Sequence, residues 1–179
     1  ITPFVGHITE QMAYQGHDVH VLLPDHPDLV DRENITLHPF TYAENGSMEY
    51  KAVSSDTSNI SPIEAAKFVR KAYQAAKTLE KEYEFDLVHC HWTLPSGVVG
   101  ALLKFRAGTP LVVHTHGRDV YNIPEIGYDV PSDWRARIIL NRVLRYADHV
   151  VANSQNCYSY AHQVGAKSKT SSVIPYGTD

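Results

Sequence analysis

The chain has 179 residues, of which 43% are hydrophobic and 20% are charged, as in an ordinary soluble globular protein. A chain of this length buries about 70% of its unfolded surface around one core, so we expect one domain or a large piece of one. A formal net charge of -4 and a pI near 6.3 provide no positive field for nucleic acid, which we exclude as a partner.

Neither an export signal nor a membrane span is predicted, because no run approaches about 18 apolar residues and no charged segment precedes an apolar one at the start. The two cysteines, Cys90 and Cys157, lie far apart within apolar segments. This pattern favours reduced, packed thiols and a cytoplasmic location.

The amino end predicts a helix followed by two strands. Thr2 and Pro3 are typical of an N-cap and a first helical residue, and Gly16 is typical of a helix end. Strands are predicted over residues 19–23 and 34–40. Only about ten residues separate them, too few for a comfortable helical crossover, so their mutual direction stays open.

Residues 41–60 are rich in Ser, Asn, Asp and Gly and predict a long loop, either a mobile binding element or plain disorder. A capping box, Ser61-Pro62-Ile63-Glu64, opens a helix to about residue 83. Its apolar residues advance by three and four, which predicts one face packed on a sheet. These residues are Ile63, Ala66, Val69, Tyr73, Ala76, Leu79 and Tyr83.

The remaining sequence alternates strand and helix at regular spacing. Strands are predicted at 86–90, 111–115, 149–152 and 172–174, and helices at 95–106, 132–146 and 154–165. Such alternation predicts an α/β fold with a Rossmann-like, doubly wound, mostly parallel sheet.

Two histidine pairs follow apolar runs of strand type: His89 with His91, and His114 with His116. Open α/β sheets bind ligands at the carboxyl ends of their strands. Because each pair has i, i+2 spacing, two adjacent strands could offer four imidazoles to a zinc ion, which makes a metal-dependent hydrolase one alternative. Against it, no acidic residue except Asp119 sits with either pair as a ready general base or metal ligand.

Five segments together resemble the amino-terminal domain of retaining GT-B glycosyltransferases of group 1, or family 4. They are Gly-His-Asp-Val at 16–19, Phe-Asp-Leu-Val-His-Cys-His-Trp at 85–92, Leu-Val-Val-His-Thr-His-Gly-Arg-Asp at 111–119, Ala-Asp-His-Val-Val-Ala-Asn-Ser at 147–154 and Val-Ile-Pro-Tyr-Gly-Thr-Asp at 173–179. Each motif is weak alone, but the five occur in the family's order across the whole chain.

The resemblance implies two Rossmann-like domains facing a cleft, the first binding the acceptor and the second most of the donor. Residues 1–174 would be the amino-terminal domain, and 175–179 the start of a linker to a donor-binding domain outside this chain. The family has a first strand and a glycine-rich turn before the helix that here opens at Thr2. We therefore expect the strand after Gly16 to lack a neighbour, and the piece alone to be weakly stable and inactive.

The resemblance implies that His116, before Gly117, contacts the donor sugar near the reacting centre and is the catalytic residue; the alternative is a histidine bonded to loop carbonyls. Gly117 would let the backbone approach the donor, or would only make the turn. Arg118 could fork onto a phosphate, and Asp119 could accept sugar hydroxyls. Pairing with loop residues explains Arg118 and Asp119 equally well.

Acceptor contacts are predicted at the mouths of the same strands. The ring of Trp92 could stack on a sugar or form part of the wall. Free N–H groups at Ser96 and Gly97 could hold an acceptor anion. The other predicted contacts are His91, Tyr121, Asn122 and Arg135, with Asn153 and Ser154 weaker candidates because Ser154 is typical of a helix cap.

The helix at 132–146 carries Arg135, Arg137, Arg142 and Arg145 beside apolar residues. It could meet a membrane surface that presents a lipid-linked acceptor, or bind a phosphorylated acceptor, although an ordinary amphipathic helix is favoured. A cytoplasmic protein at or near the inner face of the membrane is expected.

No tightly bound cofactor and no metal are expected; the donor substrate is a UDP-, GDP- or ADP-sugar. The resemblance implies that the residues that choose the nucleotide lie in the donor-binding domain, outside this chain. A non-catalytic sugar-binding module is the third alternative.

Overall fold

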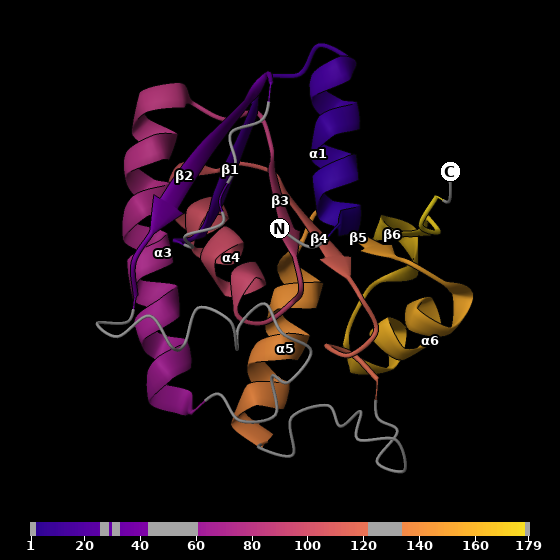
Figure 1. Ribbon diagram of the computed structural model, residues 1–179. Coiled ribbons are helices and arrows are strands. Elements are labelled where there is room, and N and C mark those ends of the chain that lie inside the picture. The colour runs from indigo at the N-terminus through magenta and orange to yellow at the C-terminus, as the bar shows by residue number, and fades with distance from the viewer. Residues whose placement is uncertain (1–2, 26–28, 30–32, 43–60, 122–133, 178–179) are drawn as a thin grey trace. The chain divides into compact units, whose positions relative to one another are not determined.

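All paired strands in the described part of the chain run in parallel, and helices separate most of them along the sequence (Figure 1). The computed structural model describes residues 3–25, 29, 33–42, 61–121 and 134–177. The elements are α1 (Pro3–Tyr14), β1 (Val19–Pro24), β2 (Ile35–Phe40), α3 (Pro62–Tyr83), β3 (Val88–His91), α4 (Ser96–Ala107), β4 (Leu111–Thr115), α5 (Trp134–Tyr146), β5 (His149–Ala152), α6 (Gln155–Val164), a 3-10 turn (Ser168–Thr170) and β6 (Ser171–Val173). They form two units, Ile1–Leu79 and Glu80–Asp179.

The first unit contains a two-stranded parallel sheet, which settles the direction that the sequence left open. Val19 of β1 lies opposite Ile35 of β2, and α1 packs on both strands. The ring of Phe40 meets that of Phe68 on α3 edge to face, with centroids 5.2 Å apart. Among the described residues, β1 pairs with β2 alone.

Helix α3 begins at the predicted capping box. The Ser61 hydroxyl accepts a 3.2 Å bond from the Glu64 N–H, and the Glu64 carboxylate accepts a 2.8 Å bond from the Ser61 N–H. The predicted packing stripe is wrong at its ends, because Ile63 is 70% exposed. Ala72 and Ala76 are the buried positions of the helix, so the packed row advances by four residues and is centred on small side chains.

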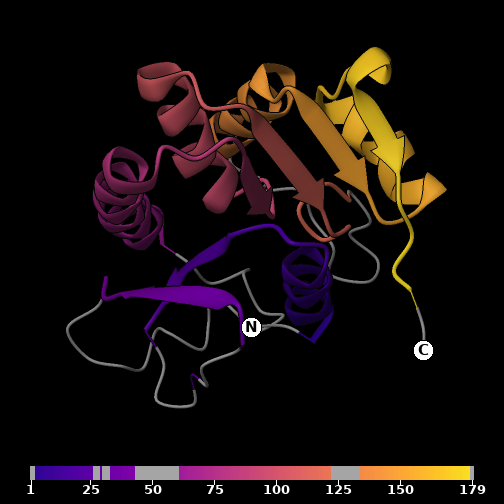
Figure 2. The same cartoon turned by 90° about the horizontal axis from the view of Figure 1, so that it is seen from above.

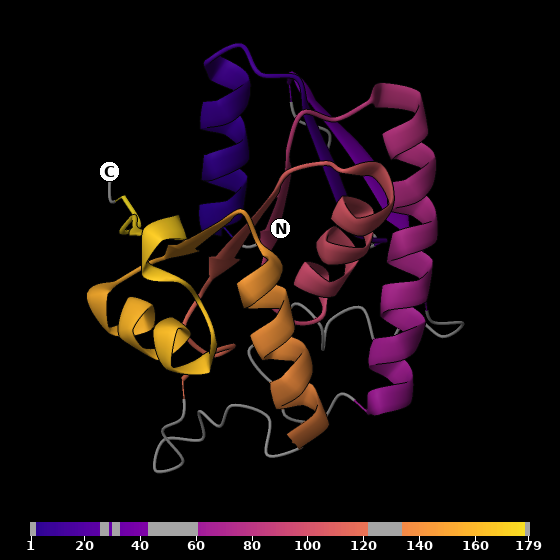
Figure 3. The ribbon, with the colours of Figure 1, turned by 180° about the vertical axis from the view of Figure 1, so that it is seen from behind.

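The second unit contains a four-stranded parallel sheet in the order β3-β4-β5-β6. Helices α4, α5 and α6 lie side by side on one face of this sheet (Figures 2 and 3). Each helix connects two neighbouring parallel strands, and such crossovers share one hand, which places all three on the same face. This unit matches the predicted Rossmann-like architecture.

The core of the second unit lies between the sheet and these helices. Leu111, Val113 and Val150 point into it from the strands and meet Leu140 and Leu144 of α5. All five are almost completely buried, which explains the apolar runs in the sequence.

Both cysteines are free and buried, as predicted. Gly100 brings α4 close to the sheet, because a Cβ there would lie 2.6 Å from the Cys90 Sγ and 2.5 Å from a methyl carbon of Leu111.

Ser154 caps α6 as predicted, since its hydroxyl accepts a 3.1 Å bond from the Cys157 N–H.

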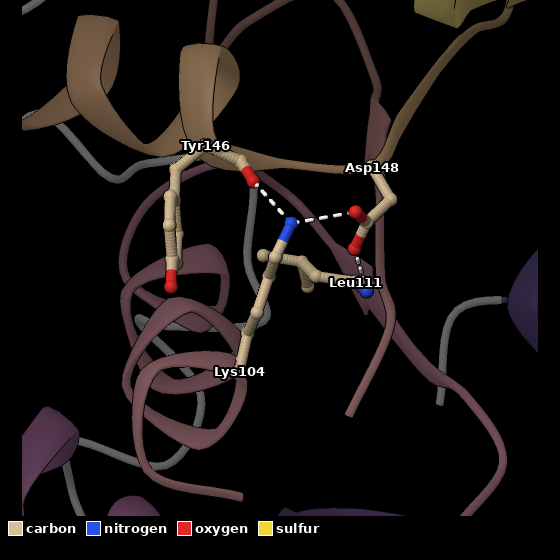
Figure 4. Close-up of polar contacts among 4 residues, drawn as sticks. All are labelled: Lys104, Leu111, Tyr146 and Asp148. Carbon is tan, nitrogen blue, oxygen red and sulfur yellow. Dashed lines mark hydrogen bonds and ion pairs between the residues drawn. The ribbon is translucent and has the colours of Figure 1, made fainter. Parts of the chain in front are cut away.

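A polar cluster joins α4, β4, α5 and β5 at the amino ends of the two strands (Figure 4). The Lys104 ammonium donates to the Asp148 carboxylate at 2.6 Å and to the Tyr146 carbonyl at 2.8 Å. The second Asp148 oxygen accepts the Leu111 N–H at 2.8 Å. This cluster fixes one edge of the sheet, whereas the histidine pairs lie toward the carboxyl edge.

Candidate active site

Four histidines share one face of the four-stranded sheet. Cys90 lies against Gly100 of α4, so the flanking residues His89 and His91 point away from the helices. His114 on β4, and His116 just after it, project from the same face as the β3 pair. The ring centroids are 4.6 Å apart within each pair and 5.4 Å apart between His91 and His114. The predicted juxtaposition of the two pairs is confirmed.

Burial keeps these imidazoles uncharged. Burial first, and neighbouring histidines second, lower the pKa of His114 to about 4, that of His116 to about 3 and that of His91 to about 2. The pKa of His89 is also lowered by burial. The four rings are therefore neutral near pH 7, and each can donate through one nitrogen and accept through the other.

The hydrogen bonds of the four rings are unequal. His91 Nδ1 lies 3.1 Å from His116 Nε2, so one of these rings donates to the other. His116 Nδ1 bonds the Tyr176 hydroxyl. By contrast, both nitrogens of His114 and the Nε2 of His89 are buried without a hydrogen-bond partner among the described residues.

Asp119 holds the backbone of His116 in place. One carboxylate oxygen accepts the His116 N–H at 2.9 Å, and the other accepts the N–H and the hydroxyl of Thr93, each at 2.9 Å. Burial raises the pKa of this carboxyl, and the bonds from Thr93 and His116 act in the opposite direction. Asp119 therefore pairs with loop residues, which is one of the two interpretations that the sequence allowed. A contact between Asp119 and a sugar hydroxyl stays a prediction.

Gly117 makes a turn that other residues could not. Its φ is +98°, and a Cβ would lie 2.6 Å from the Tyr121 ring. Its carbonyl accepts the N–H groups of Val120 and Tyr121. The Tyr121 ring in turn meets Tyr160 edge to face, with centroids 5.2 Å apart. Arg118 lies partly buried in the same turn. Donor contacts by Gly117 and Arg118 and an acceptor contact by Tyr121 stay predictions.

Trp92 occupies an unusual backbone conformation beside His116. Its φ is +67°, a region that bulky residues rarely adopt and that is common at functional sites. Its N–H donates to the His114 carbonyl at 3.0 Å, which fixes the turn after β3. The indole lies 4.8 Å from the His116 ring, so Trp92 forms a wall of this site. Stacking on a sugar stays a prediction.

The start of α4 is less open than the sequence suggested. The Gly97 N–H already donates to the Trp92 carbonyl at 3.2 Å, and a Cβ at Gly97 would lie 2.8 Å from a methyl carbon of Val143. Gly97 thus serves helix packing, and the predicted anion contact rests on Ser96, which is partly buried.

Two further predicted contacts differ in what the structure says of them. Asn122 lies outside the described residues. Arg135 is exposed on α5, with its guanidinium 5.4 Å from the centre of the Trp134 ring.

Three residues around His116 were not predicted to position it, although Asn153 was a weaker candidate for an acceptor contact. They are Tyr176, which follows β6, Thr93, which shares Asp119 with it, and Asn153, whose amide donates to the His116 carbonyl at 3.5 Å. A signal existed for Tyr176, because a residue just after the last parallel strand must lie at the same edge of the sheet as His116.

The comparisons with known proteins agree on a family. The profile of Glycosyltransferase Family 4 matches residues 2–179. An uncharacterized glycosyltransferase of Methanocaldococcus jannaschii is 29% identical over 119 residues, which are 65% of this chain and 30% of that protein.

Two solved structures share the fold. Sucrose-phosphate synthase from Thermosynechococcus elongatus has a TM-score of 0.71 and 19% identity over 98% of this chain and 42% of its own. UDP-N-acetylglucosamine 2-epimerase from Rickettsia bellii has a TM-score of 0.51 and 11% identity over 89% of this chain and 45% of its own.

The present chain spans less than half the length of each of these three proteins. The structural likeness shows the fold alone, since it includes a synthase and an epimerase. The family profile covers almost every residue. The chain therefore belongs to glycosyltransferase family 4, and its fold is the Rossmann-like amino-terminal half of a GT-B glycosyltransferase.

Proposed function

We propose that the protein transfers a sugar from a UDP-, GDP- or ADP-sugar to an acceptor hydroxyl with retention of configuration. The residues of this chain form the acceptor side of the cleft, and a donor-binding domain of the same protein forms the other side. Membership of glycosyltransferase family 4 supports the reaction class. The placement of His116 carries the proposal for the site.

His116 has the preorganisation that a transferase site requires. Asp119 holds its backbone N–H, His91 and Tyr176 contact its two ring nitrogens, and Trp92 lies against its ring. A hydrogen-bonding side chain held in this way stabilises charge that develops in the transition state, because it does not have to reorient during the reaction. We assign the catalytic role to His116. Its hydrogen bond to the donor sugar requires a sugar oxygen to replace the Tyr176 hydroxyl at Nδ1 or His91 at Nε2.

The residues around His116 have separate proposed roles. Gly117 and Arg118 face the diphosphate of the donor, where a guanidinium can fork onto phosphate oxygens. Trp92, Ser96 and Tyr121 contact the acceptor, as do His91, Asp119, Asn122 and Arg135. Neutral imidazoles suit this site, because they can bond sugar hydroxyls as donors or acceptors.

The acceptor is lipid-linked or phosphorylated, as the exposed face of α5 supports. Trp134 is 64% exposed, and Ile138 and Ile139 are 44% and 45% exposed beside four arginines. Apolar and basic residues on one helix surface favour contact with anionic lipid headgroups. On this ground we place the protein in the cytoplasm, peripheral to the inner face of the membrane. No helix among the described residues is long and apolar enough to cross a membrane.

The test uses the full-length protein and a panel of nucleotide sugars. Product formation is followed together with donor hydrolysis, and the anomeric configuration of the product is read by NMR. The His116→Ala variant should lose most turnover. His149→Ala is the matched control, because His149 is another strand histidine, bonded through Nε2 to the Ser172 hydroxyl at 2.8 Å.

The outcomes separate the alternatives. Transfer that survives EDTA and fails in His116→Ala supports the proposal. Hydrolysis without transfer that is abolished by EDTA would favour the metal-dependent hydrolase. Binding of sugars without turnover of any donor would favour the non-catalytic module.

A further inference from the structure

The histidine cluster contains more ligating capacity than the proposed transfer uses. His116 and its partners account for one edge of the cluster, whereas His89 and His114 have no role in that reaction. We propose that His89, His91 and His114 form a binding site for one divalent transition-metal cation of the zinc class.

The backbone already brings three imidazoles together. His91 and His114 are direct neighbours in the parallel pairing of β3 with β4, and His89 lies two residues earlier on the same face of β3. One ring nitrogen of each residue lies within 4.8 Å of the other two. In a tetrahedral zinc site the nitrogens are about 3.4 Å apart, so rotation of the side chains closes the site while the strands stay in place.

Unpaired buried nitrogens point independently to a ligand. His114 is only 3% exposed, and neither of its nitrogens has a hydrogen-bond partner among the described residues. The Nε2 of His89 is also buried without a hydrogen-bond partner among the described residues. Leaving such an atom unsatisfied is unfavourable, because it has lost its hydrogen bonds to water without replacing them. A cation that accepts one lone pair from each ring removes part of this cost.

The chemistry of the three ligand atoms indicates which class of metal would bind. Imidazole is a good ligand for Zn²⁺, Cu²⁺ and Ni²⁺, whereas Mg²⁺ and Ca²⁺ prefer oxygen. The group contains three imidazoles and no carboxylate. The intervening Cys90 lies on the helix side of β3, so no thiolate joins the three rings. Three protein nitrogens leave a fourth position for water or a small anion.

This site departs from the expectation that the protein binds no metal, and it shares one residue, His91, with the proposed transfer site. His91 connects the two, because its Nδ1 contacts His116 Nε2 at 3.1 Å. Such contacts outside the ligand set orient the ring of a metal-binding histidine. The metal therefore needs a test that does not depend on turnover.

The test measures metal binding by the full-length protein without a polyhistidine tag. The protein is stripped with a chelator, then equilibrated with Zn²⁺ or Co²⁺, and bound metal is counted by mass spectrometry. We expect one ion per chain. The Co²⁺ form should show the intense visible bands of a four-coordinate site, in contrast to the faint spectrum of the hexaaqua ion.

Variants assign the ligands. His89→Gln and His114→Gln should each weaken Zn²⁺ binding by at least about 100-fold, since losing a ligand costs more than losing a residue that only orients one. His149→Gln should bind as the unaltered protein does. Circular dichroism shows whether each variant is folded.

The proposal is overturned if the unaltered protein binds no ion or gives only the six-coordinate Co²⁺ spectrum. Unchanged binding in both folded variants, or equal loss in His149→Gln, also overturns it. If the variants unfold, the stoichiometry and spectrum of the unaltered protein decide the question. Because no readout involves sugar transfer, the metal site and the proposed function can each fail alone.

Discussion

The carboxylate of Asp119 accepts two hydrogen bonds from Thr93, one from its backbone N–H and one from its hydroxyl, each 2.9 Å long. Thr93 follows β3 and Asp119 follows β4, so this contact joins the loops at the carboxyl ends of two neighbouring strands. The second Asp119 oxygen holds the His116 N–H. The geometry of the proposed catalytic residue thus depends on a carboxylate that bonds protein donors.

Replacing Asp119 by Asn should therefore affect both stability and turnover. The NH₂ group of the new side chain would face an N–H donor, which leaves a buried donor unsatisfied at a cost of about 1–3 kcal/mol. Turnover should fall mainly through kcat, because His116 is displaced while most binding contacts remain. Urea unfolding and steady-state kinetics of the full-length protein measure the two effects. Asp86→Asn, at an exposed position, is the control; equal stability of the two variants would contradict the assigned role.

Tyr176→Phe tests the partner of His116 that the sequence did not reveal. The hydroxyl bonds His116 Nδ1 and fixes which tautomer the ring adopts. A single neutral hydrogen bond contributes about 0.5–1.5 kcal/mol, which corresponds to a loss of at most about tenfold in turnover. We expect a smaller effect than that of His116→Ala. Tyr146→Phe serves as the control, and a loss as large as that of His116→Ala would give Tyr176 a direct role.

Local patterns were enough to predict most of the elements. The capping box at Ser61 and the cap at Ser154 are read from neighbours in the sequence, and both occur as predicted. The i, i+2 spacing of the two histidine pairs fixed their shared face, because a strand alternates its side chains. Regular alternation of strands and helices was sufficient for the parallel sheet.

Contacts between distant residues were not predictable in the same way. Thr93 and Asp119 are 26 residues apart and Tyr176 is 60 residues from His116, so no local spacing encodes these bonds. The packed face of α3 was misplaced because hydrophobicity ranks Ile63 above Ala72, whereas close packing favours the smaller side chain. The unpaired nitrogens of His114 depend on what surrounds the ring in three dimensions.

The cluster around Asp148 should contribute to stability through its backbone contact more than through its ion pair. Asp148 is about half exposed, and exposed ion pairs contribute at most about 1 kcal/mol. Lys104→Met should therefore have a small effect. Asp148→Ala should cost more, because the Leu111 N–H also loses its acceptor.

Urea unfolding of the two single variants and of the double variant measures how much this cluster contributes to the free energy of unfolding. Lys77→Met is the exposed control. The bond from Lys104 is the main cause that lowers the pKa of Asp148, so the contribution of this carboxylate is present above its unfolded pKa near 3.8 and is lost as pH falls through the lower folded value. A larger loss of stability in Lys104→Met than in Asp148→Ala would contradict the greater weight assigned to the backbone contact.

Acid should destabilise the protein through its buried histidines. Unfolded histidine has a pKa near 6.5, whereas burial lowers the pKa of His114 to about 4 and that of His116 to about 3. As pH falls, these histidines therefore bind protons in the unfolded chain before they do so in the folded protein. The stability associated with the neutral rings is present above pH 6.5 and is lost progressively toward pH 4 and below, by about 1.4 kcal/mol per pH unit for each excess proton.

His114→Phe removes one of these titrating groups and fills its volume with an apolar ring. The variant should lose less stability than the unaltered protein between pH 7 and pH 4, and it should gain at pH 7 because two unpaired nitrogens disappear. Urea unfolding at pH 7, 6, 5 and 4 in the presence of a chelator measures this difference without a contribution from bound metal. His149→Phe is the matched control for replacing a strand histidine by an apolar ring. Parallel stability curves for His114→Phe and the unaltered protein would mean that His114 is already accessible to protons in the folded state.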